Sequence, residues 1–288
     1  MDHILRALER ADSERGRREP VLEERAVPVV VSERPGHWPE EIAYSRTRRV
    51  SVSREVLRKQ RVIAGHDASA SADAYKILCT QVLRHMRAER MKTLAVLSPS
   101  PGEGKTLTAI NLGISVSREL GHSVLLVDAD LRRPGVHRYF GLEVDAGLSE
   151  HLLDAVPLEE ILVNPGIPAF VLLPGGKPLP NSAEMLGSVR MRELVEELKG
   201  RYASRIVIFD LPPALSVADA IAFVPNVDAA IMVVEEGRTA ADEILRVADL
   251  LGPTPLLGTV LNNSRSSAQS DEALPGTDTR RWFRSRKA

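Results

Sequence analysis

Between residue 69 and about residue 263, short apolar runs alternate with segments of helical periodicity, and this alternation constrains the fold more than any other feature of the sequence. Apolar runs bounded by polar or turn residues are typical of buried strands. Strands that alternate with helices predict an α/β fold, a doubly wound and mostly parallel sheet covered on both faces. The predicted strands are Leu94–Leu97, Val124–Val127, Phe170–Leu173, Ile206–Phe209, Ala229–Val234 and Leu256–Leu261, and the predicted helices span 71–89, 105–120, 183–199, 214–223 and 238–251.

Composition narrows the class of protein. The 288 residues carry 38 Lys and Arg against 39 Asp and Glu, whereas nucleic-acid binders usually show a basic excess. The single cysteine, Cys79, excludes an internal disulfide and disfavours a cysteine-based zinc site. No apolar run approaches the roughly 18 residues of a membrane-spanning helix, and the N-terminus does not read as a secretory signal. We therefore expect a cytoplasmic protein with no membrane span of its own and no nucleic-acid partner.

The chain divides into three segments. Residues 1–68 are rich in charge, and we interpret them as a flexible N-terminal arm with a short helix around residues 4–8. Residues 69–263 form the predicted domain, and residues 264–288 form a flexible polar and basic tail that ends in RRWFRSRKA. The arm is either a solvated linker or a docking segment. The tail is either a solvated end or a contact for anionic lipid.

A glycine-containing loop follows the first predicted strand and leads directly into a helix, which predicts a P-loop NTPase fold. Gly102 and Gly104 allow the backbone to curl so that its N–H groups point at phosphate oxygens. Lys105 supplies a mobile cation for the β and γ phosphates, and the Thr106 hydroxyl suits Mg²⁺. Pro99 stands where the general pattern has its first glycine, so a plain strand-to-helix turn is the competing interpretation. The predicted nucleotide-contacting residues of the loop are Pro101, Gly102, Glu103, Gly104, Lys105, Thr106 and Leu107.

Two further predicted strands end in carboxylates. Asp128 and Asp130 follow one apolar run, and their spacing of two places both side chains on the same face. Asp210 follows another run directly. Ligands of doubly wound sheets bind beyond the carboxyl ends of the strands, so three acids and the loop are expected to converge there. Helix capping is the alternative role for any one of these aspartates.

The motifs PGEGKT, LLVDADLRRP and VIFDLPP resemble the Walker A, Walker A′ and Walker B motifs of the bacterial tyrosine kinases. Similar matches are LPGG followed by PNSAEML, and the closing GTVLN, whose Asn262 corresponds to a residue implied to touch adenine. The resemblance covers about residues 71–263. The stretch ILRALERA near the N-terminus is similar to the variant associated with exosortase-linked exopolysaccharide clusters.

The resemblance implies a role for each residue that matches a family motif. Lys105 would bind the β and γ phosphates of ATP, and Thr106 with Asp210 would hold Mg²⁺. Asp128 would accept the proton of the substrate tyrosine, with Asp130 next to the metal. The implied catalytic residues are therefore Lys105, Asp128 and Asp130, and the implied cofactors are ATP and Mg²⁺. Positioning and charge neutralisation are the main requirements of phosphoryl transfer.

The family implies an ATP-dependent protein-tyrosine kinase that regulates exopolysaccharide or capsule biosynthesis and export. Its implied partner is a membrane-embedded polysaccharide co-polymerase, which would hold the protein at the inner face of the membrane. Two alternatives remain at this stage: a nucleotide switch that transfers phosphate only to water, and a positioning ATPase. Positioning ATPases carry a signature lysine five residues before the loop lysine, where this chain has Ser100.

The tyrosines depart from the family pattern, because none of them lies in the tail. We expect the most accessible acceptor within the chain to be the one in the arm, Tyr44, among several arginines. A tyrosine of the partner is an equally good acceptor. The four tyrosines are Tyr44, Tyr75, Tyr139 and Tyr202.

We predict that the isolated protein forms no stable closed ring, although a homo-oligomer is compatible with the family. In the family, an acid and two arginines on the helix before Walker A lock subunits together, and here the corresponding residues are Asp73, Lys76 and Cys79. Lysine cannot form the bidentate hydrogen bonds of arginine. A neutral cysteine cannot replace the positive charge of the second arginine. Light scattering at micromolar concentration tests this, and a well-populated octamer would contradict it.

Overall fold

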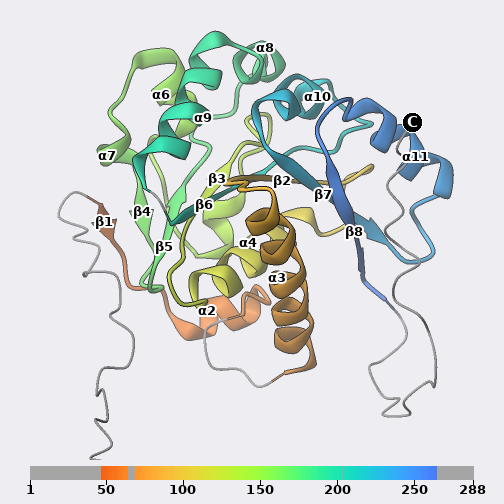
Figure 1. The fold of residues 1–288 in the computed structure, drawn as a ribbon. Coiled ribbons are helices and arrows are strands. Elements are labelled where there is room, and N and C mark those ends of the chain that lie inside the picture. Colours follow the sequence, from red (N-terminus) through yellow and green to blue (C-terminus); the bar gives the residue numbers. More distant parts are fainter. Residues whose placement is uncertain (1–46, 64–68, 203, 265–288) are drawn as a thin grey trace, which may run out of the picture. The chain divides into compact units, whose positions relative to one another are not determined.

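A mixed but mostly parallel sheet forms the centre of the described chain (Figure 1). The computed structural model describes residues 47–63, 69–202 and 204–264, and within them the strand order is β1-β4-β5-β3-β6-β2-β7-β8. Every described strand pair is parallel except β4 with β5. The predicted α/β fold is therefore confirmed. The strands are β1 (Arg48–Arg49), β2 (Thr93–Leu97), β3 (Ser123–Asp128), β4 (Val163–Asn164), β5 (Phe170–Leu173), β6 (Arg205–Asp210), β7 (Ala229–Glu235) and β8 (Leu256–Asn262).

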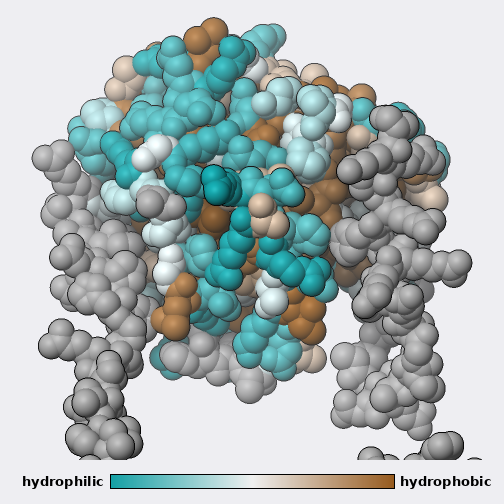
Figure 2. Space-filling view, in the orientation of Figure 1, coloured by the Kyte–Doolittle hydropathy of each residue, from teal (hydrophilic) through white to brown (hydrophobic). Residues whose placement is uncertain are grey.

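Helices cover both faces of the sheet because successive strand residues point to opposite sides. On β3, Val124 and Leu126 belong to one hydrophobic cluster, and Leu125 and Val127 belong to the other. The first cluster packs against α2 (Arg54–Lys59), α3 (Ala70–Ala88), α4 (Lys105–Ser117) and α5 (Val136–Tyr139). The second packs against α6 (Leu148–Asp154), α7 (Leu158–Ile161), α8 (Ser182–Leu186), α9 (Val189–Arg201), α10 (Asp219–Phe223) and α11 (Ala241–Leu250). In the space-filling view, hydrophilic residues cover most of the visible face (Figure 2).

Residues 47–63, which we call the strap, are ordered, and the structure differs here from the expected flexible arm. Ser53 caps α2 by accepting a hydrogen bond from the Glu55 amide. Leu57, Val62 and Ile63 are buried against the domain. The single short helix gives too few turns for a periodicity to be recognised in the sequence. The short helix around residues 4–8, Tyr44 and the tail from residue 265 lie outside the described residues.

Two predicted helices are interrupted or shorter than expected. The segment 183–199 forms α8 and α9, because Ser188 leaves the helical conformation and its side chain caps α9 by accepting from the Met191 amide. The segment 214–223 is helical only from Asp219. Among the described helices, none has both the length and the apolar character needed to cross a membrane.

The three α3 residues that correspond to the family's ring motif have separate environments. Asp73 and Lys76 are exposed and pair with each other at 2.9 Å. Cys79 is 1% exposed, and burial raises the pKa of its thiol to about 12. The thiol is therefore a core side chain, and the ring prediction still awaits its measurement.

Asn111 of α4 attaches the strap to the domain. Its Oδ1 accepts from the Ile63 amide at 2.9 Å, and its Nδ2 donates to the Arg61 carbonyl at 3.2 Å. Asn111 is 1% exposed, so truncation of its side chain leaves the buried Ile63 amide and the partly buried Arg61 carbonyl without their partner.

We predict that Asn111→Ala lowers the free energy of unfolding by about 1–3 kcal/mol, the cost of unsatisfied buried polar groups. Urea unfolding of the full chain measures this. Ser115→Ala is the matched control, because the Ser115 hydroxyl donates to a carbonyl of its own helix and forms no hydrogen bond with the described strap. Equal losses in the two variants would contradict the role of Asn111 as the attachment point.

Candidate active site

The loop between β2 and α4 adopts the conformation that its glycines permit. Gly102 has φ +85° and Gly104 has φ +88°, a region that residues with a side chain rarely adopt. α4 begins directly after the loop, at Lys105. The first turn of a helix has amide groups without partners inside the helix, and its positive dipole end favours anions. The loop therefore has the backbone geometry of a phosphate-binding site.

Strand register brings the predicted acids to this loop. In the sheet β6 lies between β3 and β2, with Asp128 opposite Asp210 on one side and Val96 opposite Asp210 on the other. The carboxyl ends of the three parallel strands therefore meet at one edge, next to the loop that leaves β2. This is the convergence that the sequence predicts.

Lys105 lies among the carboxylates. Its Nζ is 3.4 Å from Asp130 Oδ2 and 3.7 Å from Asp210 Oδ1, and its side chain is 12% exposed. Burial alone would lower the pKa of Lys105, but Asp210, Asp130 and Asp128 together outweigh it, so the pKa stands above its ordinary value. The ammonium group is therefore charged and directed at the acids. It also donates to Thr106 Oγ1 at 3.2 Å.

The two carboxylate oxygens of Asp128 differ in their hydrogen bonding. Its Oδ2 accepts from the amides of Gly135 and Val136 at 2.8 and 2.9 Å, at the start of α5. Its buried Oδ1 has no hydrogen-bond partner among the described residues. Burial, with the nearby Asp210, raises the pKa of Asp128 to about 7 against the opposing effect of the two amides. A carboxylate with this pKa and a free oxygen suits proton transfer near neutral pH.

The oxygens near Lys105 fit a hard cation. Asp210 is 1% exposed, and burial raises its pKa even though Lys105 and Thr106 act in the opposite direction. Its buried Oδ1 is 3.7 Å from Lys105 Nζ and has no hydrogen-bond partner among the described residues. In the described part of the chain, no group of three or more His, Cys, Asp or Glu side chains is arranged to hold a metal ion. The oxygens of Thr106, Asp130 and Asp210 are of the kind that Mg²⁺ prefers, and Mg²⁺ commonly takes its remaining ligands from water and phosphate.

The other predicted contacts also lie at the loop. Asn262, at the end of β8, donates from Nδ2 to the Glu103 carbonyl at 2.9 Å. The Pro101 carbonyl accepts from Arg238 Nη2 at 2.9 Å. Leu107 is a partly buried residue of the cluster on the α4 face.

Sequence reasoning missed Arg238 and Thr239, which both contact the loop. Their partners lie 137 and 136 positions away, and the turn that carries them has no motif of its own. It also missed Asp219, a fully buried acid whose Oδ1 lies 3.7 Å from Arg132 Nη2. Short sequence motifs cannot indicate contacts between residues that are this far apart in the chain.

We predict that Asp128→Asn stabilises the nucleotide-free and metal-free protein increasingly as the pH rises. The folded chain keeps the Asp128 proton up to about pH 7, whereas the unfolded chain loses it near 3.8. The folded state therefore binds more protons in this window, and wild-type stability decreases from about pH 4 to about pH 7. Urea unfolding at about pH 5 and about pH 8 should give a larger difference between the Asp128→Asn variant and wild type at the higher pH. Asp154→Asn, at an exposed site, is the control, and the same pH dependence there would contradict the assignment.

The chain is similar to known kinases over most of its length. A family model described as an AAA domain matches residues 91–250. The tyrosine-protein kinase YwqD of Bacillus subtilis (strain 168) is 34% identical over 211 residues, which cover 73% of this chain and 88% of that protein. A putative tyrosine-protein kinase in the cps region of Klebsiella pneumoniae is 37% identical over 153 residues. These cover 53% of this chain but only 21% of that longer protein.

Solved structures agree with the sequence relatives. The kinase domain of the Escherichia coli tyrosine kinase ETK superposes with a TM-score of 0.65 and 26% identity, covering 80% of this chain and 94% of that one. The chimerical protein CapA2B2 gives a TM-score of 0.65 and 25% identity, with 74% and 91% covered. With its loop, its acids and these relatives, the chain belongs to the bacterial tyrosine-protein kinase family and has the P-loop ATPase fold.

Proposed function

We propose that this chain is an ATP-dependent protein-tyrosine kinase of a capsule or exopolysaccharide system. The observation that carries the proposal is the position of Lys105, between the phosphate-binding loop and the carboxylates that end β3 and β6. The similarity to YwqD over most of both chains supports the same conclusion.

The loop and Lys105 bind the substrate ATP in this proposal. The loop amides and the first turn of α4 hydrogen-bond to phosphate oxygens, and Lys105 neutralises charge on the β and γ phosphates. Asp130 and Asp210 orient the Lys105 ammonium group toward the proposed phosphate site. Such preorganised charge contributes to phosphoryl transfer because it needs no rearrangement during the reaction.

Thr106, Asp210 and Asp130 are the proposed holders of Mg²⁺. When bound, Mg²⁺ supplies charge neutralisation to the phosphate oxygens. The buried Oδ1 of Asp210, which has no hydrogen-bond partner in the described part of the chain, is available to a metal or to its water shell. Asp130 is already held by the Arg133 amide, which orients its carboxylate.

Asp128 is the proposed proton acceptor for the tyrosine hydroxyl. The Gly135 and Val136 amides fix its Oδ2, so Oδ1 is the oxygen available to receive a proton. Its pKa of about 7 means that a substantial fraction is ionised at neutral pH and that the group binds a proton without a large cost.

We further propose a membrane-embedded co-polymerase as the partner and the inner face of the membrane as the location. The likeness to CapA2B2 and the family resemblance support a partner of this class. The exosortase-associated variant is proposed from the ILRALERA stretch alone, which lies outside the described residues.

The nucleotide switch is the second candidate function, and the tyrosines are the observation that favours it. Tyr139 is half-buried, and burial, together with Asp210, raises the pKa of its phenol. Tyr75 is half-buried too, and Tyr202 carries Arg205 over its ring at 3.8 Å. Tyr75 and Tyr139 are therefore poorly accessible as acceptors, whereas Tyr202 is exposed. A positioning ATPase is disfavoured by Ser100, because the family's signature lysine is absent there.

We predict phosphotyrosine on Tyr44 or on the membrane partner when the full chain is incubated with Mg²⁺-ATP. Mass spectrometry with and without the partner maps the phosphate. ATP turnover without phosphotyrosine on either protein would favour the nucleotide switch.

Lys105→Ala is the variant that tests the site in the same assay. It removes the cation at the β and γ phosphates, so we expect neither turnover nor phosphotyrosine. Lys59→Ala, at an exposed position in α2, is the matched control and should retain both. Turnover by Lys105→Ala at the wild-type rate would contradict the assigned site.

A further inference from the structure

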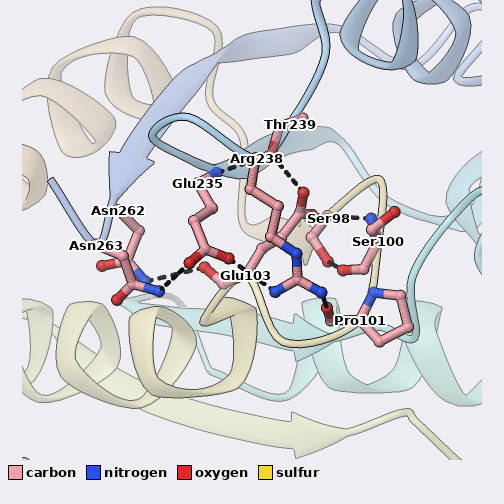
Figure 3. Close-up of polar contacts among 9 residues, drawn as sticks. All are labelled: Ser98, Ser100, Pro101, Glu103, Glu235, Arg238, Thr239, Asn262 and Asn263. Atoms are coloured by element: carbon pink, nitrogen blue, oxygen red, sulfur yellow. Dashed lines mark hydrogen bonds and ion pairs between the residues drawn. The ribbon is translucent and has the colours of Figure 1, made fainter.

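Residues of two segments that are distant in the sequence bond to the phosphate-binding loop (Figure 3). One comprises the last residue of β7, Glu235, and the turn between β7 and α11, which contributes Arg238 and Thr239. The other is the end of β8, which contributes Asn262. We call these four residues the outer clamp.

Glu103 is the loop residue that the outer clamp holds. Its side chain is completely buried, and its Oε2 accepts from the Ser100 amide within the loop at 2.8 Å. Its Oε1 accepts a hydrogen bond from the Thr239 hydroxyl. The same hydroxyl accepts from the Glu235 amide at 2.9 Å. A continuous chain of hydrogen bonds therefore runs from the end of β7 into the loop.

Arg238 and Asn262 hold the loop backbone directly. Arg238 donates from Nη2 to the Pro101 carbonyl at 2.9 Å, while its Nη1 donates to Glu235 Oε2 at 2.9 Å. Arg238 and Asn263 lower the pKa of Glu235, so this anchoring carboxylate is ionised. A side chain at Gly102 would lie 3.2 Å from Arg238 Nη1, and one at Gly104 would collide with the Asn262 amide.

A buried carboxylate in this loop has an electrostatic disadvantage. Phosphates and carboxylates repel each other, and burial increases the strength of that repulsion. The Glu103 carboxylate is instead engaged by the Ser100 amide within the loop and by the Thr239 hydroxyl outside it. Its position near the N-terminus of α4 is also favourable for a negative charge.

We propose that Glu103 is a positioning residue, and that Thr239 and Arg238 act through it and through Pro101 to keep the loop amides in their phosphate-binding arrangement. The turn between β7 and α11 thereby sets the affinity for ATP without touching its phosphates. The proposal rests on the proposed ATP-dependent function. It assigns a role to three residues through contacts that no nucleotide-binding motif describes.

The direction in which Glu103→Gln changes ATP affinity distinguishes a positioning role of Glu103 from electrostatic repulsion of phosphate. Gln removes the negative charge but presents an amide group where an acceptor is needed. If repulsion of phosphate dominated, Glu103→Gln would bind ATP more tightly than wild type. Positioning predicts about tenfold weaker binding or more, since hydrogen bonds to charged groups contribute at that level.

Thr239→Val and Thr239→Ser form a matched pair. Val keeps the shape of threonine without its hydroxyl and should weaken ATP binding about tenfold, whereas Ser keeps the hydroxyl and should stay within about threefold of wild type. Thr254→Val is the control, because Thr254 donates a buried hydrogen bond to the Val224 carbonyl outside the clamp. It should lower the melting temperature but leave ATP affinity unchanged.

The measurements are the Kd for a fluorescent ATP analogue, the KM and kcat for ATP, and the melting temperature of each full-length variant. We expect a double-mutant cycle of Glu103→Gln with Thr239→Val to be strongly non-additive, because both remove one shared contact. Additive effects, or tighter binding by Glu103→Gln, would overturn the proposal. If Glu103→Gln does not fold, the Thr239 variants decide: wild-type ATP affinity in Thr239→Val, or equal losses in Thr239→Val and Thr239→Ser, would overturn the proposal. Failure of wild type to bind ATP would instead overturn the proposed function.

Discussion

The parallel pairing of β3 with β6 and of β6 with β2 is the constraint on which the site depends. The pairing places Asp128 opposite Asp210 and both beside the loop that leaves β2. A register shift of one residue would turn one of these carboxylates to the other face of the sheet. The same shift would exchange the two hydrophobic clusters on that strand, so core packing and site geometry are fixed together.

The site contains buried carboxylates, whose burial is energetically unfavourable and must be offset by the stability of the rest of the fold. Asp128 and Asp210 are both buried, each has an oxygen without a hydrogen bond to any described residue, and burial raises the pKa of both. Lys105 forms an ion pair with Asp210 at 3.7 Å. Sites of this kind are typical of phosphoryl-transfer enzymes, because the oxygens left free in the protein are the ones that a metal and a nucleotide require.

Much of this arrangement could be predicted from the sequence, because its signals are local in the chain. The glycines around Lys105 and the acids that end two apolar runs are short patterns with a direct physical meaning. The strap could not be predicted, since Leu57, Val62 and Ile63 become buried only through contacts with distant helices such as α4. The contact between Glu103 and Thr239 spans 136 residues and depends on the strand order. Short motifs therefore identify the residues that carry the proposed chemistry, whereas the strand order determines which distant side chains contact them.

The strand order places the strap's β1 at one edge of the sheet and β8 at the other. β1 and β8 are the two outer strands of the described sheet, so residue 47 and residue 264 lie at opposite edges (Figure 1). Seven strand spacings of about 4.8 Å separate those edges by roughly 34 Å. That distance corresponds to about ten residues of extended chain. Partners that bind beside β1 and beside β8 would therefore contact opposite edges of the sheet and would not compete for one edge.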